Sequence, residues 1–126
     1  IKNDVLLDMC NNFYVNLDDS MRLYHSRIIS LESLVYIDCN DTNTKTNIYK
    51  ILGMSNNDNL LECAILLDFE LSLEILQILI RAKITFVIAK QIQNFGVLKT
   101  AQKFGLTIGY FNKNEVNILS HSSRIV

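Results

Sequence analysis

The sequence predicts an α/β fold: a three-layer arrangement with a mixed β-sheet and βαβ units. Three short, almost continuously apolar runs, residues 60–67, 84–89 and 106–111, are typical of strands buried on both faces. Amphipathic helical segments, residues 71–82 and 95–104, separate them. Strands that alternate with helices of this length form parallel pairs through right-handed crossovers.

The remaining segments add one helix and antiparallel strands at both ends of the chain. Apolar residues at i, i+3 and i+4 spacing predict a helix over residues 4–13. Residues 21–29 and 34–39 are β-rich and predict a hairpin, and residues 116–119 predict a final strand. We expect residues 44–52 to be helical, with Gly53 as the C-cap. No repeat or domain boundary interrupts residues 1–126, so we expect a single α/β domain.

Composition argues against several classes of partner. The 12 basic and 13 acidic residues leave a net charge of −1, which provides no overall surplus for nucleic acid or anionic lipid. The apolar runs are far shorter than the roughly 20 residues of a membrane span. Three cysteines without a C-x-x-C pair favour a reducing, cytoplasmic setting. The chain begins without Met, as expected for part of a longer protein.

Common catalytic and cofactor motifs are absent from the sequence. Four scattered glycines form neither a P-loop nor a G-x-G-x-x-G turn, and no G-x-S-x-G elbow occurs. Neither histidine stands in a zinc pattern, so no metal is expected. The three isolated cysteines are most simply interpreted as buried apolar residues, since Cys10 and Cys63 lie on apolar faces; exposure is an alternative for Cys39 alone, which stands at a strand end.

Ligands of open α/β sheets bind beyond the carboxyl ends of the strands. In this sequence those positions are residues 68–70, 90–94 and 112–114, together with the loop 40–44. All four segments are polar, but none contains a recognisable catalytic grouping. The residues alone therefore predict where a ligand would bind, and they do not predict an activity.

The C-terminal half contains an ordered set of short motifs. Ser72-Leu73-Glu74-Ile75 is followed by the apolar run 82–88, then by Ile108-Gly109-Tyr110 and finally by residues 117–125. This order resembles the formate dehydrogenase accessory protein family (FdhD, also NarQ), which has S-[YF]-E-x-V, a strand, a helix, I-G-F and N-V-Y-T-H-P-E-R-I. Upstream, Asp41, Lys50 and His25 match or fall near further family motifs.

The departures from the family are equally specific. Residues 43–47 replace the family's G-R-H-N-A, residues 21–23 replace T-G-G, and residues 91–95 replace S-A-P-T-S. Ser122 and Ser123 stand where the terminal motif has Pro and Glu. The family's C-x-x-C, its sulfur-carrying element, is absent from this chain, so no catalytic residue is assigned.

The resemblance implies a cytidine-deaminase-like domain with a defined role. In the family, sulfur passes from a cysteine desulfurase to a molybdenum guanine-dinucleotide cofactor for formate dehydrogenase. The residues that match family motifs would bind this cofactor or a GDP-like nucleotide: His25, Asp41, Lys50, Ser72, Glu74, Asn117, His121 and Arg124. We expect the ligand between the loop after Cys39 and residues 117–124, with Arg124 pairing two phosphate oxygens.

Two functions from different classes therefore remain. The chain is either a divergent FdhD-like accessory protein that handles or sulfurates the cofactor, or a catalytically inactive module of the same fold that acts through protein–protein contacts. Under the second hypothesis Asp41, Lys50 and Arg124 are ordinary surface charges and His121 stabilises a turn. Binding of GDP separates the two.

Overall fold

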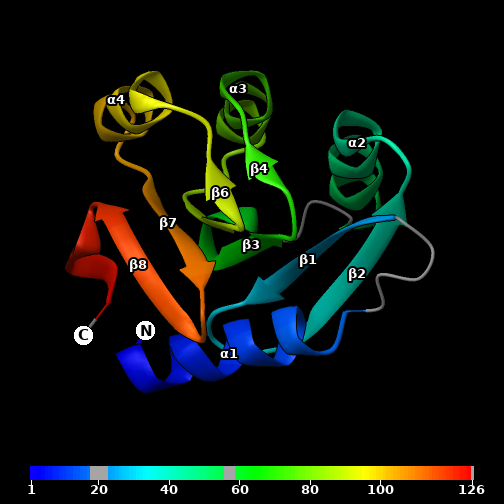
Figure 1. The fold of residues 1–126 in the computed structure, drawn as a ribbon, viewed down its shortest axis with the longest axis horizontal. Helices are drawn as coiled ribbons and strands as arrows, with labels where there is room; N and C mark the ends of the chain where they lie inside the picture. Colours follow the sequence, from blue (N-terminus) through cyan, green and yellow to red (C-terminus); the bar gives the residue numbers. More distant parts are fainter. Residues whose placement is uncertain (18–22, 56–58, 126) are drawn as a thin grey trace.

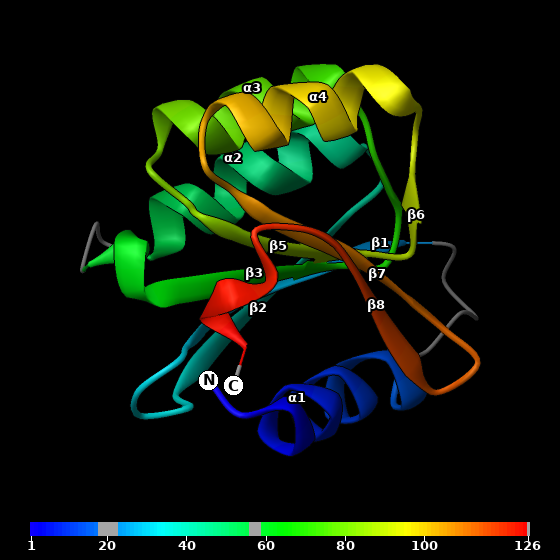
Figure 2. The same ribbon diagram turned by 90° about the vertical axis from the view of Figure 1, so that its left-hand side faces the viewer.

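The computed structural model describes residues 1–17, 23–55 and 59–125, and its main elements form three layers (Figures 1 and 2). The helices are α1 (Asn3–Val15), α2 (Thr44–Met54), α3 (Leu73–Arg81) and α4 (Phe95–Lys103). The strands of the main sheet are β1 (Tyr24–Ser30), β2 (Tyr36–Asp41), β3 (Cys63–Leu67), β5 (Phe86–Ala89), β7 (Thr107–Asn112) and β8 (Glu115–Ser120). The short strands β4 (Glu70–Leu71) and β6 (Gln91–Ile92) pair separately.

The main sheet is mixed, as predicted. Its strand order is β2-β1-β3-β5-β7-β8. Strands β3, β5 and β7 are parallel, whereas β1 and β8 run antiparallel to their neighbours. Helices α2, α3 and α4 lie side by side on one face, and α1 covers the other (Figure 2). The α/β class and the mixed sheet are thereby confirmed.

Two apolar cores explain why the central strands have uninterrupted apolar sequences. Ile65 and Leu67 of β3 pack in the core beneath α2, α3 and α4. Ala64 and Leu66, on the opposite face of the same strand, pack in the core with α1. A strand buried on both faces needs apolar side chains at successive positions, which is what residues 63–67 provide.

Several boundaries differ from the sequence-based expectation. Leu60–Glu62 form a one-turn 3₁₀ helix instead of the start of a strand, because Asn59 adopts a left-handed conformation and its carbonyl accepts from Glu62 N. Gly53 lies inside α2, whose C-cap is Ser55. Gly105, with φ +72°, does terminate α4 as expected. Residues 21 and 22 of the predicted hairpin lie outside the described residues.

The sheet has two chemically different ends. At one end of the sheet, β2, β3, β5 and β7 finish and β1 and β8 begin. We call this end the carboxyl end. The opposite, amino end carries the start of β7, the end of β8 and a 3₁₀ turn, Ser122–Arg124. Polar loops follow the strands at the carboxyl end, where α/β sheets present ligand sites.

Candidate functional site

A cleft of about 890 Å³ opens at the carboxyl end of the sheet. Asp68 follows β3, Lys90 and Gln91 follow β5, and Tyr110 and Lys113 come from the β7–β8 hairpin. Its volume lies within the range of ordinary small-molecule sites. We call this feature the carboxyl-end cleft. It uses residues from the three segments that the sequence placed after strands β3, β5 and β7.

Tyr14 of α1 forms part of the wall of this cleft. Its hydroxyl donates to the carbonyl of Leu67 at 2.6 Å and lies 3.1 Å from the carbonyl of Ile88. Its ring stacks on Phe111 with centroids 4.7 Å apart. Burial raises the pKa of the Tyr14 hydroxyl well above its usual value, so the side chain stays a neutral donor. Tyr14 thus attaches α1 to the ends of β3 and β5.

The carboxylate of Asp68 is hydrogen-bonded to His25. His25 N donates to Asp68 Oδ1 at 2.6 Å, and His25 Nδ1 lies 2.8 Å from Asp68 Oδ2. Within the described residues the side chains of Lys90 and Lys113 form no ion pair and no hydrogen bond. Within the part of the chain that the structure describes, the two ammonium groups are therefore available to an anion, while the carboxylate of Asp68 is hydrogen-bonded.

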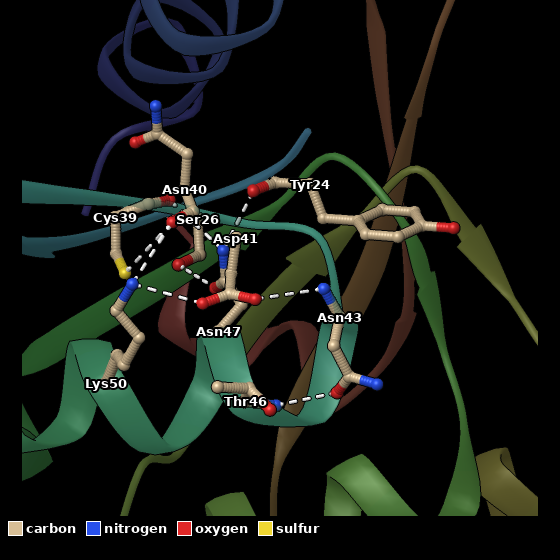
Figure 3. Close-up of polar contacts among 9 residues, drawn as sticks. All are labelled: Tyr24, Ser26, Cys39, Asn40, Asp41, Asn43, Thr46, Asn47 and Lys50. Carbon is tan, nitrogen blue, oxygen red and sulfur yellow. Dashed lines mark hydrogen bonds and ion pairs between the residues drawn. The ribbon is translucent and has the colours of Figure 1, made fainter. Parts of the chain in front are cut away.

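Asp41 and Lys50 form an ion pair at the end of β2 (Figure 3). Lys50 Nζ lies 3.0 Å from Asp41 Oδ2, and Asn43 N donates to Asp41 Oδ1 at 3.0 Å. The hydrogen bond from Lys50 holds the pKa of Asp41 below its usual value. Both charges are thus used to join the β2 terminus to α2.

Asn47, beneath this pair, is fully buried in α2 (Figure 3). Its amide donates to the carbonyls of Tyr24 at 2.9 Å and Cys39 at 3.2 Å, and it accepts from the hydroxyl of Ser26. These bonds tie the Asn47 side chain to the backbones of β1 and β2. The cluster attaches α2 to the hairpin, and none of its residues lines the carboxyl-end cleft.

Ser72 and Glu74 have local partners on the helix layer. The Ser72 hydroxyl caps α3 by accepting from Ile75 N at 3.2 Å. The Glu74 carboxylate pairs with Lys45 of α2. Both residues therefore stabilise helices in this structure.

The remaining three predicted site residues lie on or beyond β8, at the other edge of the sheet. Asn117 pairs with Tyr110 in the middle of β8. His121 Nε2 lies 3.2 Å from the carbonyl of Gln102. Arg124 Nη1 donates to the Gly105 carbonyl at 3.1 Å and to Thr107 Oγ1 at 2.8 Å.

The expectation of one site between the loop after Cys39 and residues 117–124 is therefore wrong. Strands β2 and β8 are opposite edges of the sheet, with four strands between them. Asp41 also lies at the carboxyl end, whereas Arg124 lies at the amino end, tied to the start of β7. The chain places β2 on one side of β1 and adds β3, β5, β7 and β8 in turn on the other side, so β2 and β8 become the two edges.

All three cysteines are buried. Cys10, Cys39 and Cys63 expose 0%, 5% and 9% of their surface. Burial raises the pKa of the Cys10 thiol to about 12, and burial also raises the pKa values of Cys39 and Cys63. The interpretation of all three cysteines as buried is confirmed, and the alternative of an exposed Cys39 is wrong because Cys39 belongs to the core beneath α2.

In residues 1–17, 23–55 and 59–125, no three His, Cys, Asp or Glu side chains gather as metal ligands. In the same part of the chain, none of the helices has the length and apolarity that a membrane crossing demands.

The cleft contains residues that the motif comparison did not select. Lys90 and Lys113 lie in segments already placed at the carboxyl end, so strand order was sufficient to find them. No sequence feature pointed to Tyr14, because only the packing of α1 brings it to the ends of β3 and β5.

Fold and cleft together define an α/β domain that presents a binding surface at the carboxyl end of a mixed sheet. A solved structure shares this fold: that of a "putative formate dehydrogenase accessory protein" from Desulfotalea psychrophila, with a TM-score of 0.69 and 14% sequence identity. The match covers 81% of this chain and 48% of that protein, so the likeness concerns about half of it. No family model and no curated protein matches the sequence.

Proposed function

We propose that this chain is the ligand-holding part of an accessory protein for formate dehydrogenase. In this proposal the carboxyl-end cleft binds the nucleotide portion of a molybdenum guanine-dinucleotide cofactor, or GDP itself. The observation that carries the proposal is the cleft at the ends of β3, β5 and β7, in a fold shared with a structure of that description. The cytidine-deaminase-like relationship belongs to the same proposal.

The cleft residues fit the chemistry of a nucleotide diphosphate. Lys90 and Lys113 supply two ammonium groups for phosphate oxygens. Gln91 and Asn112 supply amide donors and acceptors for the edge of a base, and Tyr110 supplies an aromatic surface. Asp68 repels an anion less than a free carboxylate would, because His25 is bound to it.

This chain would hold the cofactor without acting on it chemically. When bound, the cofactor supplies the molybdenum centre to which sulfur is added. A persulfide carrier needs an accessible thiolate, and the three buried cysteines with raised pKa values do not provide one. Formate dehydrogenase and a cysteine desulfurase are accordingly partners of the proposed function, and the sulfur-carrying group lies outside these three residues.

Isothermal titration of GDP tests the proposal. We expect saturable heat with the parent chain and an affinity at least about tenfold lower in the Lys90→Ala/Lys113→Ala variant, because each lysine loses a bond to a charged group. Lys2→Ala, at the start of α1, is the matched control and should bind as the parent does. Titrations with ADP and pyrophosphate separate recognition of the base from recognition of the phosphates.

Absence of both heat and thermal stabilisation at millimolar GDP contradicts nucleotide binding. That result favours the alternative function, a binding module of the same fold that acts through protein contacts. The buried cysteines support this alternative equally, because neither function requires a reactive thiol on this chain.

A further inference from the structure

The near-zero net charge conceals a strong separation of charge along the chain. Residues 1–74 carry a formal charge of −7, whereas residues 75–126 carry +6. Between Glu74 and Glu115 there are six basic residues and no acidic one. A segment of this length without a carboxylate produces a positive field that the total charge does not reveal.

The fold gathers the basic segment on one side of the molecule. Residues 75–126 form most of α3, together with β5, α4, β7 and β8, which are neighbours in the sheet and the helix layer. Helix α4 is the last helix of its row, with α3 on one side and an open flank on the other (Figure 1). The acidic half of the sequence forms α2 and the β1–β2 hairpin, toward the sheet edge opposite to β8, and α1, which covers the sheet face opposite to α4 (Figure 2).

Helix α4 presents both basic and aromatic side chains to solvent. Val97 and Ala101 face the core, whereas Phe95, Lys99, Gln102 and Lys103 are exposed. The exposed residues have i, i+4, i+7 and i+8 spacing, so they share one side of the helix, which we call the α4 outer face. Phe95 exposes 66% of its surface, and Phe104, at the C-cap, exposes 55%.

The lysines and phenylalanines of this region are arranged in pairs. Lys99 Nζ lies 5.5 Å from the ring centroid of Phe95, and Lys103 Nζ lies 5.7 Å from that of Phe104. Helix α4 thus has a largely exposed phenylalanine ring at its first residue and another at its C-cap, each beside a lysine. Aromatic anchors beside cations are a usual composition of protein-binding surfaces.

No carboxylate of the adjoining elements neutralises the α4 outer face. Helix α4 packs on α3, β7 and β8. Glu74, the acidic residue of α3, is paired with Lys45 of α2. Glu115 is at the start of β8, in the hairpin that also carries Lys113. At the other end of α4, His121 and Arg124 add basic groups near Gln102 and Gly105.

We propose that the α4 outer face is the docking surface for an acidic protein partner, in which carboxylates pair with Lys99 and Lys103 and an apolar side chain covers Phe95. Charge complementarity identifies the chemistry of the partner, because the surface combines uncompensated lysines with an exposed aromatic ring. The proposal is independent of nucleotide binding, since the carboxyl-end cleft uses Lys90 and Lys113 instead.

Titration with a synthetic amphipathic helix of Glu and Leu, about four turns long, tests the proposal. Amide NMR should show saturable shifts in residues 95–105. Affinity should fall at least about tenfold in Lys99→Glu/Lys103→Glu and about fivefold in Phe95→Ser. It should also weaken at about 0.5 M NaCl, where the screening length is only a few ångströms.

Charge reversal provides the decisive control. A peptide with Lys in place of Glu should bind Lys99→Glu/Lys103→Glu better than it binds the parent, whereas Lys2→Glu, across the sheet, should leave the original affinity unchanged. Unfolding midpoints and GDP titrations of the same variants verify that the fold and the carboxyl-end cleft are intact. Restoration by the reversed peptide supports docking through these two lysines.

Three results overturn the proposal. The first is the absence of saturable shifts in residues 95–105 with the acidic peptide. The second is tighter binding of a single-stranded oligonucleotide through the same lysines, which would assign the face to nucleic acid. The third is self-association that disappears in Lys99→Glu/Lys103→Glu, which would make a second copy of this chain the partner.

Discussion

The two ends of the β-sheet contain polar side chains of similar types but use them differently. At the carboxyl end, Lys90 and Lys113 line a cleft and have no partner within the described residues. At the amino end, Arg124 and Ser120 bind backbone groups at the start of β7. The cation at the amino end is thus bound to atoms of its own chain, whereas the two lysines at the carboxyl end face a cleft.

Side chains at the amino end bind backbone groups beside an irregularity of the β7–β8 ladder and in the segment before β7. The register shifts between Ile108 and Gly109, so that Leu119 has no strand partner. Ser120 Oγ accepts from Ile108 N and donates to the Leu106 carbonyl. Arg124 supplies a donor to the Gly105 carbonyl. Ser120 and Arg124, which are residue types common in ligand sites, therefore stabilise the backbone of this domain.

The largest expected effect concerns the three buried thiols, none of which should react in the folded protein. A pKa of about 12 instead of 9.0 leaves Cys10 about 1000-fold less thiolate at neutral pH. We expect no mass increase of about 32 Da after incubation with a desulfurase and cysteine. Intact-protein mass spectrometry measures this, and unfolded protein is the positive control. A persulfide on folded Cys39 would contradict the burial argument.

The second prediction concerns a carboxyl-end residue that is committed to the fold. Asn47→Ala should lower the free energy of unfolding by about 3 kcal/mol, because a fully buried side chain loses three hydrogen bonds. Denaturant unfolding monitored by circular dichroism gives the value. Asn43→Ala, which removes only the N-cap bond of α2, should cost about 1 kcal/mol. Equal losses would mean that the Asn47 bonds contribute little.

The third prediction contrasts a cation from each end. Arg124→Ala should lower the free energy of unfolding by about 2 kcal/mol through two lost hydrogen bonds and leave GDP affinity unchanged. Lys113→Ala should leave stability nearly unchanged and weaken GDP binding about fivefold or more. Unfolding curves and calorimetry on both variants test the contrast. The reverse pattern would assign ligand binding to the amino end.

The smallest expected effect is the pH dependence of the Asp41–Lys50 pair. The folded pKa of Asp41 lies below 3.8, chiefly because Lys50 donates to its carboxylate. A lowered carboxyl pKa contributes stability above the unfolded pKa, and this contribution is lost as pH falls through the folded pKa. The difference in unfolding midpoint between the parent and Asp41→Asn should therefore be present at about pH 6 and shrink below about pH 3. A difference that grows in acid would contradict the ion pair.

Sequence reasoning was most successful where structure depends on local periodicity. The apolar spacing predicted α1, α3 and α4 within a few residues, and Gly105 marked the end of α4. Exact boundaries were less predictable: Leu60–Glu62 have the same apolar character as β3 but turn as a 3₁₀ helix. Local composition does not distinguish these cases, because the left-handed Asn59 preceding them has no strong sequence signature.

The candidate site was only partly predictable. The segments after β3, β5 and β7 were expected to present ligands, and they do line the carboxyl-end cleft. The motif comparison instead selected Arg124 and Asp41, which the sheet places at opposite edges and opposite ends. Motif order follows the chain, whereas a site requires proximity in space.

The sequence by itself determined the α/β class, the succession of helices and strands, and the separation of charge between residues 1–74 and 75–126. These properties depend on side-chain periodicity and composition, which are local. Only the tertiary structure decided three contacts: Tyr14 donates to the end of β3, His25 binds the carboxylate of Asp68, and Arg124 donates to the backbone just before β7. Those contacts join residues far apart in the chain, and they exist because the crossovers and the packing of two cores set the order of the strands.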